Sequence, residues 1–420
     1  MHTLHQRHAL RCAAAAVAAL LVALACGTTQ GTSSGPAANV PGVTDKDVLI
    51  GTTTPLSGAA SAYAPVSKGA TAYFQYVNAR GGVNGRTITY KVYDDAYDPA
   101  KAVPLVRQLV TQDNVFAVVN ELGTPVNLAT RDYLNQEKVP DLFVATGSSH
   151  WGADYKQYPY TIGYQPDYVS EGKVYAKDIL KSHPNAKIGI LYQNDDYGKD
   201  YVNGLKTGLA DKATSMVIDA ETYEANAAEV NSQVASIKSK GADLFFIVAT
   251  PKFAAQAIAV ASKLSWKPAI YLNNVGAQVP TIMNAIKASS PDAAEGIVSS
   301  TYGKDPADRA TWGNDPGMKL YYDILAKYCA GCDPNDAGYL AGMGAAWLFQ
   351  QVLQKAGRNG VTRENVMKLT RNMNLKDSPF LLPGITIQTS GDNQFPITQM
   401  ALMRWQGTGW VIDKNVISAR

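Results

Sequence analysis

The sequence predicts an α/β protein built from mostly parallel, doubly wound sheets. From Asp47 to about Leu272, short apolar segments typical of buried strands alternate with segments whose apolar residues repeat about every 3.6 positions, as in amphipathic helices. The strand segments are nearly continuous apolar runs, which is typical of parallel sheets covered by helices on both faces. The chain is also too long for a single hydrophobic core, so we expect two domains of this kind.

The first unit of this alternation ends at Pro99. A short apolar strand, Val48–Ile50, leads through a loop into a helix with one apolar stripe, and Ile88–Val92 then alternates as a half-buried strand does. Asp98 before Pro99 is typical of a helix start, with an N-cap residue and proline at the first helical position. The further strands that we expect are Phe116–Val119, Leu142–Ala145, Ile188–Tyr192, Met216–Ile218, Leu244–Val248 and Ile270–Leu272, with a C-terminal hairpin of Thr398–Trp405 and Trp410–Asp413. The further helices are Ala102–Val110, Gly172–Leu180, Val230–Lys240, Phe253–Leu264, Met318–Lys327, Gly338–Ala356 and Arg363–Arg371.

Residues 1–25 have the features of a secretory signal peptide. Two arginines precede an apolar stretch, Cys12–Ala25, of only 14 residues, which is too short for a permanent transmembrane helix. Ala23-Leu24-Ala25-Cys26-Gly27 resembles a bacterial lipobox, in which the cysteine becomes the lipidated first residue. We therefore expect a lipoprotein anchored through Cys26 to the outer face of the cell membrane, with residues 26–44 as a flexible tether. The alternative is a secreted protein that is cleaved at another position.

The charge balance and the cysteine content bear on the class of function. Removal of the signal peptide takes the formal net charge from +3 to +1, because Arg7 and Arg11 are lost, and this balance does not favour nucleic acid as a partner. Apart from Cys26, the remaining chain has only Cys329 and Cys332. In an exported protein such a Cys-x-x-Cys pair predicts a local disulfide. The alternative, a redox centre, would need a thioredoxin-like βαβ context that the flanking residues do not suggest.

Motifs for catalysis or metal binding are scarce in the sequence. His150 and His183 are the only histidines after the signal peptide, and no His/Cys cluster has metal-ligand spacing. A hydrolase in which Ser148 or Ser149 acts with His150 is the enzyme alternative, but adjacent residues rarely meet the geometry of a catalytic triad. We therefore predict a binding protein with no catalytic residue, no metal and no cofactor.

Five motifs together resemble the leucine/isoleucine/valine-binding family of periplasmic-type solute receptors, which serve ABC importers. They are Pro55-Leu56-Ser57-Gly58, Gly81–Gly85, Tyr93–Pro99, Tyr197-Gly198 and Asp292–Gly296, and they occur in the family's order and spacing. The resemblance covers about Asp47 to the C-terminus. It implies a monomer with the type I periplasmic-binding-protein fold, in which two α/β lobes close over a ligand. The three crossovers would lie near Ile162–Gln165, Gly296–Val298 and Phe395–Thr398, so that residues 45–163 and 298–395 form the first lobe and residues 164–297 and 396–420 the second.

Two loops of the predicted first lobe follow a strand and lead into a helix, which is where open α/β sheets bind ligands. Glu121–Pro125 and Ala145–Trp151 both offer hydroxyls and backbone N–H groups that can hold a carboxylate. The resemblance implies that Thr124 and Ser149, with Ser148 beside it, grip the ligand's carboxylate, and that Tyr63 and Tyr197 form aromatic walls of the cleft. Trp151 is a further candidate. The alternatives are that the serines only cap the next segment and that the aromatic residues only pack.

One departure from the family bears on the ligand. The resemblance implies an acid after the strand Ile270–Leu272 to pair with the ammonium of an amino acid, but Asn273–Gly276 contains none. Because a buried ammonium without a partner is costly, we expect a carboxylate with an apolar or aromatic body, and Glu121 is the alternative source of the missing charge. The predicted function is that of a solute-binding lipoprotein of an ABC importer, with a small carboxylate ligand and a membrane permease as its partners. A lipoprotein that senses a solute for a membrane receptor is the alternative.

Overall fold

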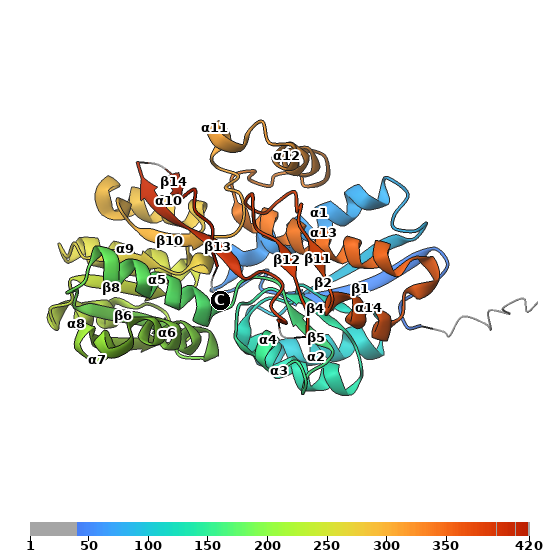
Figure 1. Cartoon of the computed structure of the whole chain (residues 1–420), viewed down its shortest axis with the longest axis horizontal. Coiled ribbons are helices and arrows are strands. Elements are labelled where there is room, and N and C mark those ends of the chain that lie inside the picture. The colour runs from blue at the N-terminus through green and yellow to red at the C-terminus, as the bar shows by residue number, and fades with distance from the viewer. Residues whose placement is uncertain (1–39, 392, 408, 419–420) are drawn as a thin grey trace, which may run out of the picture. The chain divides into compact units, whose positions relative to one another are not determined.

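The computed structural model describes residues 40–391, 393–407 and 409–418, which fall in one compact unit, Val40–Arg420. Cys26, the predicted signal peptide and most of the expected tether lie outside the described residues. Two large sheets organise this unit, as the sequence predicted, and we define the first lobe and the second lobe as these sheets with the helices packed on them (Figure 1). None of the helices formed by the described residues has the length and hydropathy needed to cross a membrane.

The first lobe contains a wholly parallel sheet in the order β2-β1-β3-β4-β5. Its strands are β1 (Asp47–Thr54), β2 (Thr87–Asp94), β3 (Val118–Val119), β4 (Asp141–Val144) and β5 (Thr161–Gly163). Its helices are α1 (Ala64–Asn78), α2 (Pro99–Thr111), α3 (Thr124–Gln136), α4 (His150–Ala153), α12 (Pro316–Tyr328), α13 (Ala337–Ala356) and α14 (Arg363–Thr370). The predicted start of α2 is confirmed, because the Asp98 side chain accepts a hydrogen bond from the N–H of Ala100 and Pro99 is the first helical residue.

The second lobe contains a mixed sheet in the order β14-β13-β10-β9-β8-β6-β7, with β15 paired to β13. Its strands are β6 (Ile188–Gln193), β7 (Val217–Tyr223), β8 (Leu244–Val248), β9 (Ala269–Leu272), β10 (Val298–Thr301), β13 (Gln399–Gln406), β14 (Gly409–Ile412) and β15 (Ile417–Ser418). Its helices are α5 (Tyr168–Ser182), α6 (Asp196–Leu209), α7 (Ala213–Met216), α8 (Asn231–Ser239), α9 (Pro251–Lys263) and α10 (Val279–Ser289). The predicted C-terminal hairpin is confirmed by the antiparallel pairing of β13 with β14.

Smaller elements complete the described chain. They are α11 (Arg309–Trp312), a two-stranded sheet of β11 (Asn374–Leu375) and β12 (Ile387–Gln388), and the 3-10 helices η1 (Ser61–Tyr63), η2 (Ala210–Lys212), η3 (Asn274–Gly276), η4 (Pro291–Ala294) and η5 (Arg358–Gly360). Cys329 and Cys332 form a disulfide in the turn between α12 and α13.

The structure corrects one predicted lobe boundary and one predicted strand boundary. Val298 was expected at a crossover, but it begins β10, which pairs with β9 and β13 inside the second sheet. The chain therefore leaves the second lobe after Thr301 rather than before Val298, and residues 298–301 belong to the second lobe. Met216 was expected in a strand, but it ends α7, and the strand begins one residue later.

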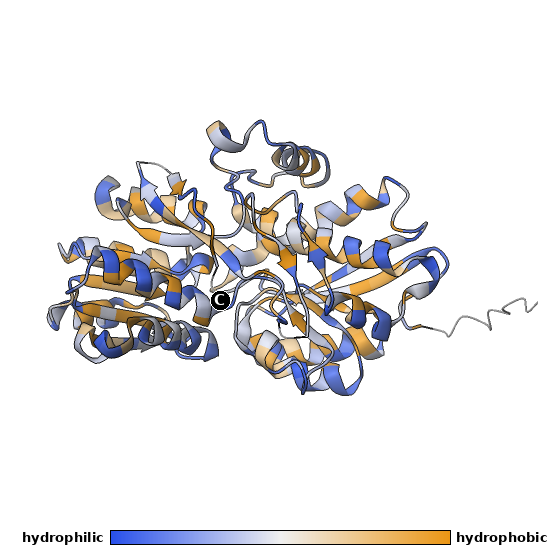
Figure 2. Cartoon of the chain, in the orientation of Figure 1, coloured by the Kyte–Doolittle hydropathy of each residue, from blue (hydrophilic) through white to orange (hydrophobic). Residues whose placement is uncertain are grey.

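Helices α1 and α13 pack with their backbones in close approach. A Cβ atom added to Gly342 would lie 1.8 Å from the carbonyl oxygen of Val66, and one added to Gly69 would lie 2.1 Å from that of Tyr339. The two glycines thus leave room for a helix contact that no larger residue permits. The core beneath these helices joins β1 to α13 and extends to Ala401, and Figure 2 shows the apolar residues concentrated in the strands and on the inner helix faces.

Candidate functional site

A cavity of about 150 Å³ is lined by residues from both lobes. The first lobe contributes the segments that follow β3 and β4, and the second lobe contributes the start of α6 and the segments that follow β8, β9 and β10. These are the carboxyl ends of parallel strands, where α/β sheets bind ligands. The wall of the cavity is rich in tyrosine, through Tyr63, Tyr97, Tyr164, Tyr168, Tyr197 and Tyr302.

Thr124 lines this cavity at the first turn of α3. Gly123 precedes it with φ +109°, and this left-handed backbone turns the chain sharply into the helix. The Thr124 Oγ1 lies 2.6 Å from Thr146 Oγ1, which in turn accepts a hydrogen bond from the N–H of Ser148. If the Thr146 hydroxyl donates to Thr124, the Thr124 O–H is left to donate into the cavity, beside the N–H groups of the helix N-terminus.

Tyr63 and Tyr197, the two predicted aromatic residues, line the cavity from opposite lobes. The Tyr63 hydroxyl donates to the carbonyl oxygen of Val275 at 3.1 Å, which ties the first lobe to the second. The Tyr197 hydroxyl accepts from Asn273 Nδ2 at 2.8 Å. Its own proton therefore remains available as a donor toward a bound molecule.

The loop after β9 has its side chains committed to the protein. Asn273 Oδ1 accepts from the N–H of Ala249, and Asn274 Nδ2 donates to the carbonyl oxygen of Ser300. The N–H of Asn274 donates to Glu171, a buried acid whose two oxygens also accept from tyrosine hydroxyls. This loop therefore offers no carboxylate to an ammonium group.

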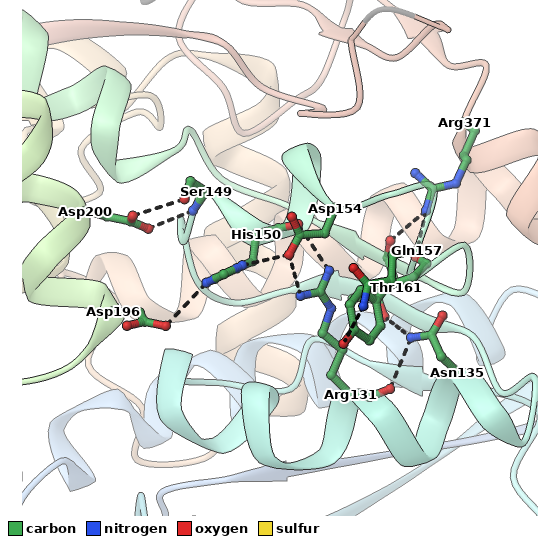
Figure 3. A network of polar contacts seen from close by, with 11 residues as sticks. Arg131, Asn135, Ser149, His150, Asp154, Gln157, Thr161, Asp196, Asp200 and Arg371 are labelled. Atoms are coloured by element: carbon green, nitrogen blue, oxygen red, sulfur yellow. Dashed lines mark hydrogen bonds and ion pairs between the residues drawn. The ribbon is translucent and has the colours of Figure 1, made fainter.

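Ser149, expected to grip the ligand, instead joins the two lobes (Figure 3). Its N–H and its Oγ donate to the two carboxylate oxygens of Asp200 on α6, at 2.8 and 3.0 Å. His150 lies between Asp154 of its own lobe, at 2.7 Å from Nδ1, and Asp196 of α6, at 3.3 Å from Nε2. We call Ser149, His150, Asp196 and Asp200 the interlobe latch.

The same geometry weighs against the hydrolase alternative. Both ring nitrogens of His150 face carboxylates, and the Ser149 hydroxyl donates to Asp200 rather than to the imidazole. Ser148 is buried and does not line the cavity, so it is not placed to attack a bound molecule. Within the described ranges, no group of three or more His, Cys, Asp or Glu could hold a metal ion.

Glu121 and Trp151, two further candidates, also lie outside the cavity wall. Glu121 is fully buried behind the wall, where its carboxylate accepts from the hydroxyls of Thr53 and Thr130 at 2.8 and 2.9 Å. Trp151 is 2% exposed and packs inside the first lobe, with the guanidinium of Arg131 4.9 Å from the ring. Neither side chain is positioned to touch a molecule in the cavity, so Glu121 does not supply the missing charge.

Burial of Glu121 makes the stability depend on pH. Burial raises its pKa to about 7, although the two threonine hydroxyls oppose the shift. The folded state thus holds a proton that the unfolded chain releases near pH 4.5, and stability falls as the pH rises from there through 7. We expect Glu121→Gln, which stays neutral, to gain about 2–3 kcal/mol relative to the wild type between pH 5 and pH 8. Urea denaturation at the two pH values measures this gain.

The matched control for Glu121 is Glu137→Gln, at the exposed end of α3. This substitution removes a carboxylate that stays in water, so the difference from the wild type should be the same at both pH values. An equal difference at both values for Glu121→Gln would show that Glu121 does not bind its proton in the folded protein.

Sequence reasoning missed several residues of the cavity wall. Tyr97 packs over the loop before α3, since a Cβ atom on Gly123 would lie 2.5 Å from its Cε2. Tyr302 and Asp305 come from the segment after β10, and Gln278 comes from the residue before α10. The signal that could have found the last three is their place just after a strand or just before a helix of the second lobe.

Comparison with known proteins agrees with this architecture. The periplasmic binding protein family matches residues 47–409. The Leu/Ile/Val-binding protein homolog 3 of Brucella melitensis is 26% identical over 204 residues, which are 48% of this chain and 54% of that protein. The chain thus spans about half the length of the curated relatives of this kind.

Solved structures with the same fold cover most of the chain. A branched chain amino acid ABC transporter protein from Thermus thermophilus with bound valine is 17% identical, with a TM-score of 0.77 over 90% of this chain and 97% of that one. A solute-binding protein of an ABC transporter from R. palustris in complex with 4-hydroxybenzoate is 18% identical, with a TM-score of 0.71 over 89% of this chain and 97% of that one. The chain therefore belongs to the periplasmic binding protein family, and the predicted resemblance to its leucine/isoleucine/valine-binding members is confirmed.

Proposed function

We propose that this protein is the solute-binding lipoprotein of an ABC importer and that it takes a small carboxylate with an apolar or aromatic body into the cavity between its lobes. The observation that carries the proposal is the composition of the cavity wall. Hydrogen-bond donors converge at Thr124, tyrosine rings form much of the remaining wall, and the loop after β9 has no acid to offer. The solute is bound without being converted.

The carboxylate is held at the N-terminus of α3. The Thr124 hydroxyl and the first N–H groups of the helix donate to it, and the helix dipole favours negative charge at this end. Such a grip needs no cationic side chain. The hydroxyl of Tyr197 is a further donor, because it already accepts from Asn273.

The apolar body lies against the tyrosine rings. Aromatic walls favour a flat apolar group and present hydroxyls that fix its orientation. Solved structures with this fold hold valine, 4-hydroxybenzoate or benzoate as bound molecules. Of these classes we favour the acids without an α-ammonium group, because Asn273 and Asn274 are committed to protein hydrogen bonds.

Binding is coupled to closure of the lobes. The ligand docks on Thr124 of the first lobe, and Tyr197 of the second lobe covers it. The interlobe latch and the bond from Tyr63 to Val275 then hold the closed state, which a membrane permease would recognise. Export and lipidation at Cys26 would place the protein outside the cytoplasm beside that permease.

The experiment that tests the proposal measures ligand binding by the purified chain. A thermal-shift screen compares branched-chain amino acids with aromatic and aliphatic acids that lack an amine, because a ligand of the native state raises the melting temperature. We expect shifts with the amine-free acids. Shifts with leucine or valine alone would overturn the ligand class.

Thr124→Val should weaken the best ligand of this screen about tenfold by calorimetry, since it removes one hydrogen bond to a charged group. The melting temperature without ligand should change little. The matched control is Thr111→Val at the exposed end of α2, which should leave the affinity unchanged. An unchanged affinity in Thr124→Val would mean that the carboxylate is held elsewhere.

A further inference from the structure

Asp305 is the one acid among the described residues that line the cavity. It lies in the segment that leads from β10 to α11, in a part of the wall that the loops of the first lobe do not form. The residue is 8% exposed. The cavity therefore has hydrogen-bond donors at Thr124 and a buried acceptor at a second place.

The two oxygens of Asp305 differ in their surroundings. Oδ1 accepts from the N–H of Ala307 at 2.9 Å, whereas Oδ2 is buried with no hydrogen-bond partner in the described part of the chain. Asp95 also has a buried Oδ2 without a partner among the described residues, but Asp95 does not line the cavity. Both oxygens of Glu121 and both oxygens of Glu171 accept hydrogen bonds from protein groups.

The neighbouring cation does not neutralise Asp305. Lys304 Nζ donates to Asp315 Oδ1 at 2.7 Å and to the carbonyl oxygen of Pro379 at 2.8 Å, so its charge is already paired. Burial raises the pKa of Asp305 to about 6, opposed in part by the bond from Ala307. At neutral pH the carboxylate is thus mostly ionised, and Oδ2 is an acceptor without a donor.

We infer that Asp305 selects solutes that carry a hydrogen-bond donor, a hydroxyl or an ammonium group, on the body remote from the carboxylate. This inference rests on the proposed function and narrows its ligand class. A donor on the ligand pairs the buried oxygen, which is costly to leave unpaired when water is excluded. A ligand placed the other way round would bring its own carboxylate against Asp305 and be repelled.

The test compares the wild type, Asp305→Asn and the control Asp323→Asn by calorimetry. Asp323 is an exposed acid on α12, so its substitution removes the same charge far from the cavity wall. The probes are benzoate, phenylacetate and 3-phenylpropionate, each against its para-hydroxy and para-aminomethyl derivatives. The para-hydroxy derivatives test a hydroxyl donor, and the para-aminomethyl derivatives test an ammonium donor.

We expect at least one derivative to bind the wild type about tenfold more tightly than its parent acid, or better. Asp305→Asn should reduce this preference to about threefold or less while leaving the parent's affinity nearly unchanged, and Asp323→Asn should leave the preference intact. The amide of Asn retains the oxygen that accepts from Ala307. If Asp305→Asn fails to fold, Asp305→Ser can replace it in the test, because serine retains an acceptor for the N–H of Ala307.

The outcomes separate this inference from the proposed function. If the parent acids bind but no derivative binds better, or if the preference survives in Asp305→Asn, the role of Asp305 is overturned and the proposed function stands. If no parent and no derivative binds while amino acids do, the proposed ligand class falls and this inference falls with it.

Discussion

Substituting Asp200 by alanine is expected to weaken ligand binding about ten- to hundredfold without unfolding the protein. Asp200 accepts two hydrogen bonds from Ser149 across the lobes, and it does not line the cavity. Removing the Asp200 carboxylate should therefore destabilise the closed state without removing a contact to the ligand. Alanine is a good helix former, so α6 should persist.

Two measurements distinguish this effect from damage to the pocket. Calorimetry gives the affinity, and small-angle X-ray scattering with saturating ligand should show that the variant closes less completely than the wild type. Asp211→Ala is the matched control, an exposed acid of the same lobe, and it should behave as the wild type does. An unchanged affinity in Asp200→Ala would mean that the interlobe latch does not stabilise the closed state.

Substituting Gly342 by alanine is expected to destabilise the protein by about 3 kcal/mol or more. The new Cβ would lie 1.8 Å from the carbonyl oxygen of Val66, a backbone atom that cannot rotate away. Helices α1 and α13 would have to separate, which opens the core of the first lobe. A loss of stability would be informative, because helix propensity alone predicts that alanine stabilises a helix relative to glycine by about 1 kcal/mol.

Urea denaturation measures this loss. Gly391→Ala is the control, since a Cβ there meets nothing within 4 Å and the residue does not have a positive φ. We expect the control to stay within about 0.5 kcal/mol of the wild type. A stability of Gly342→Ala equal to that of the wild type would show that α1 and α13 are not in backbone contact.

Periodicity and local signals predicted most of the fold. Leu244–Val248 is an unbroken apolar run, and it forms β8 with the predicted bounds. The capping signal of Asp98 before Pro99 fixed the start of α2. Val298–Thr301 was missed as a strand because it is short and contains two serines, and its pairing with β9 and β13 depends on residues far along the chain.

The site was predicted only in part, because the sequence does not say where a loop side chain points. Thr124, Tyr63 and Tyr197 line the cavity, but Glu121 turns inward to two threonine hydroxyls and Ser149 turns to the other lobe. The position of Asp305 just after a strand could have marked it as a candidate, but the sequence does not show that its side chain is buried with one oxygen unpaired. Long-range packing decides these orientations.

The course of the chain through the first lobe has a consequence for its biosynthesis. The core of that lobe combines Val48 and Phe74 with Phe349 and Ile397, which come from the opposite end of the sequence. During translation the early strands leave the ribosome long before α13 exists to cover them, so their apolar surface stays open while β6 to β10 of the second lobe are made. The first lobe to begin is thus not completed until most of the second lobe has been made, and its exposed apolar strands are open to aggregation over that interval.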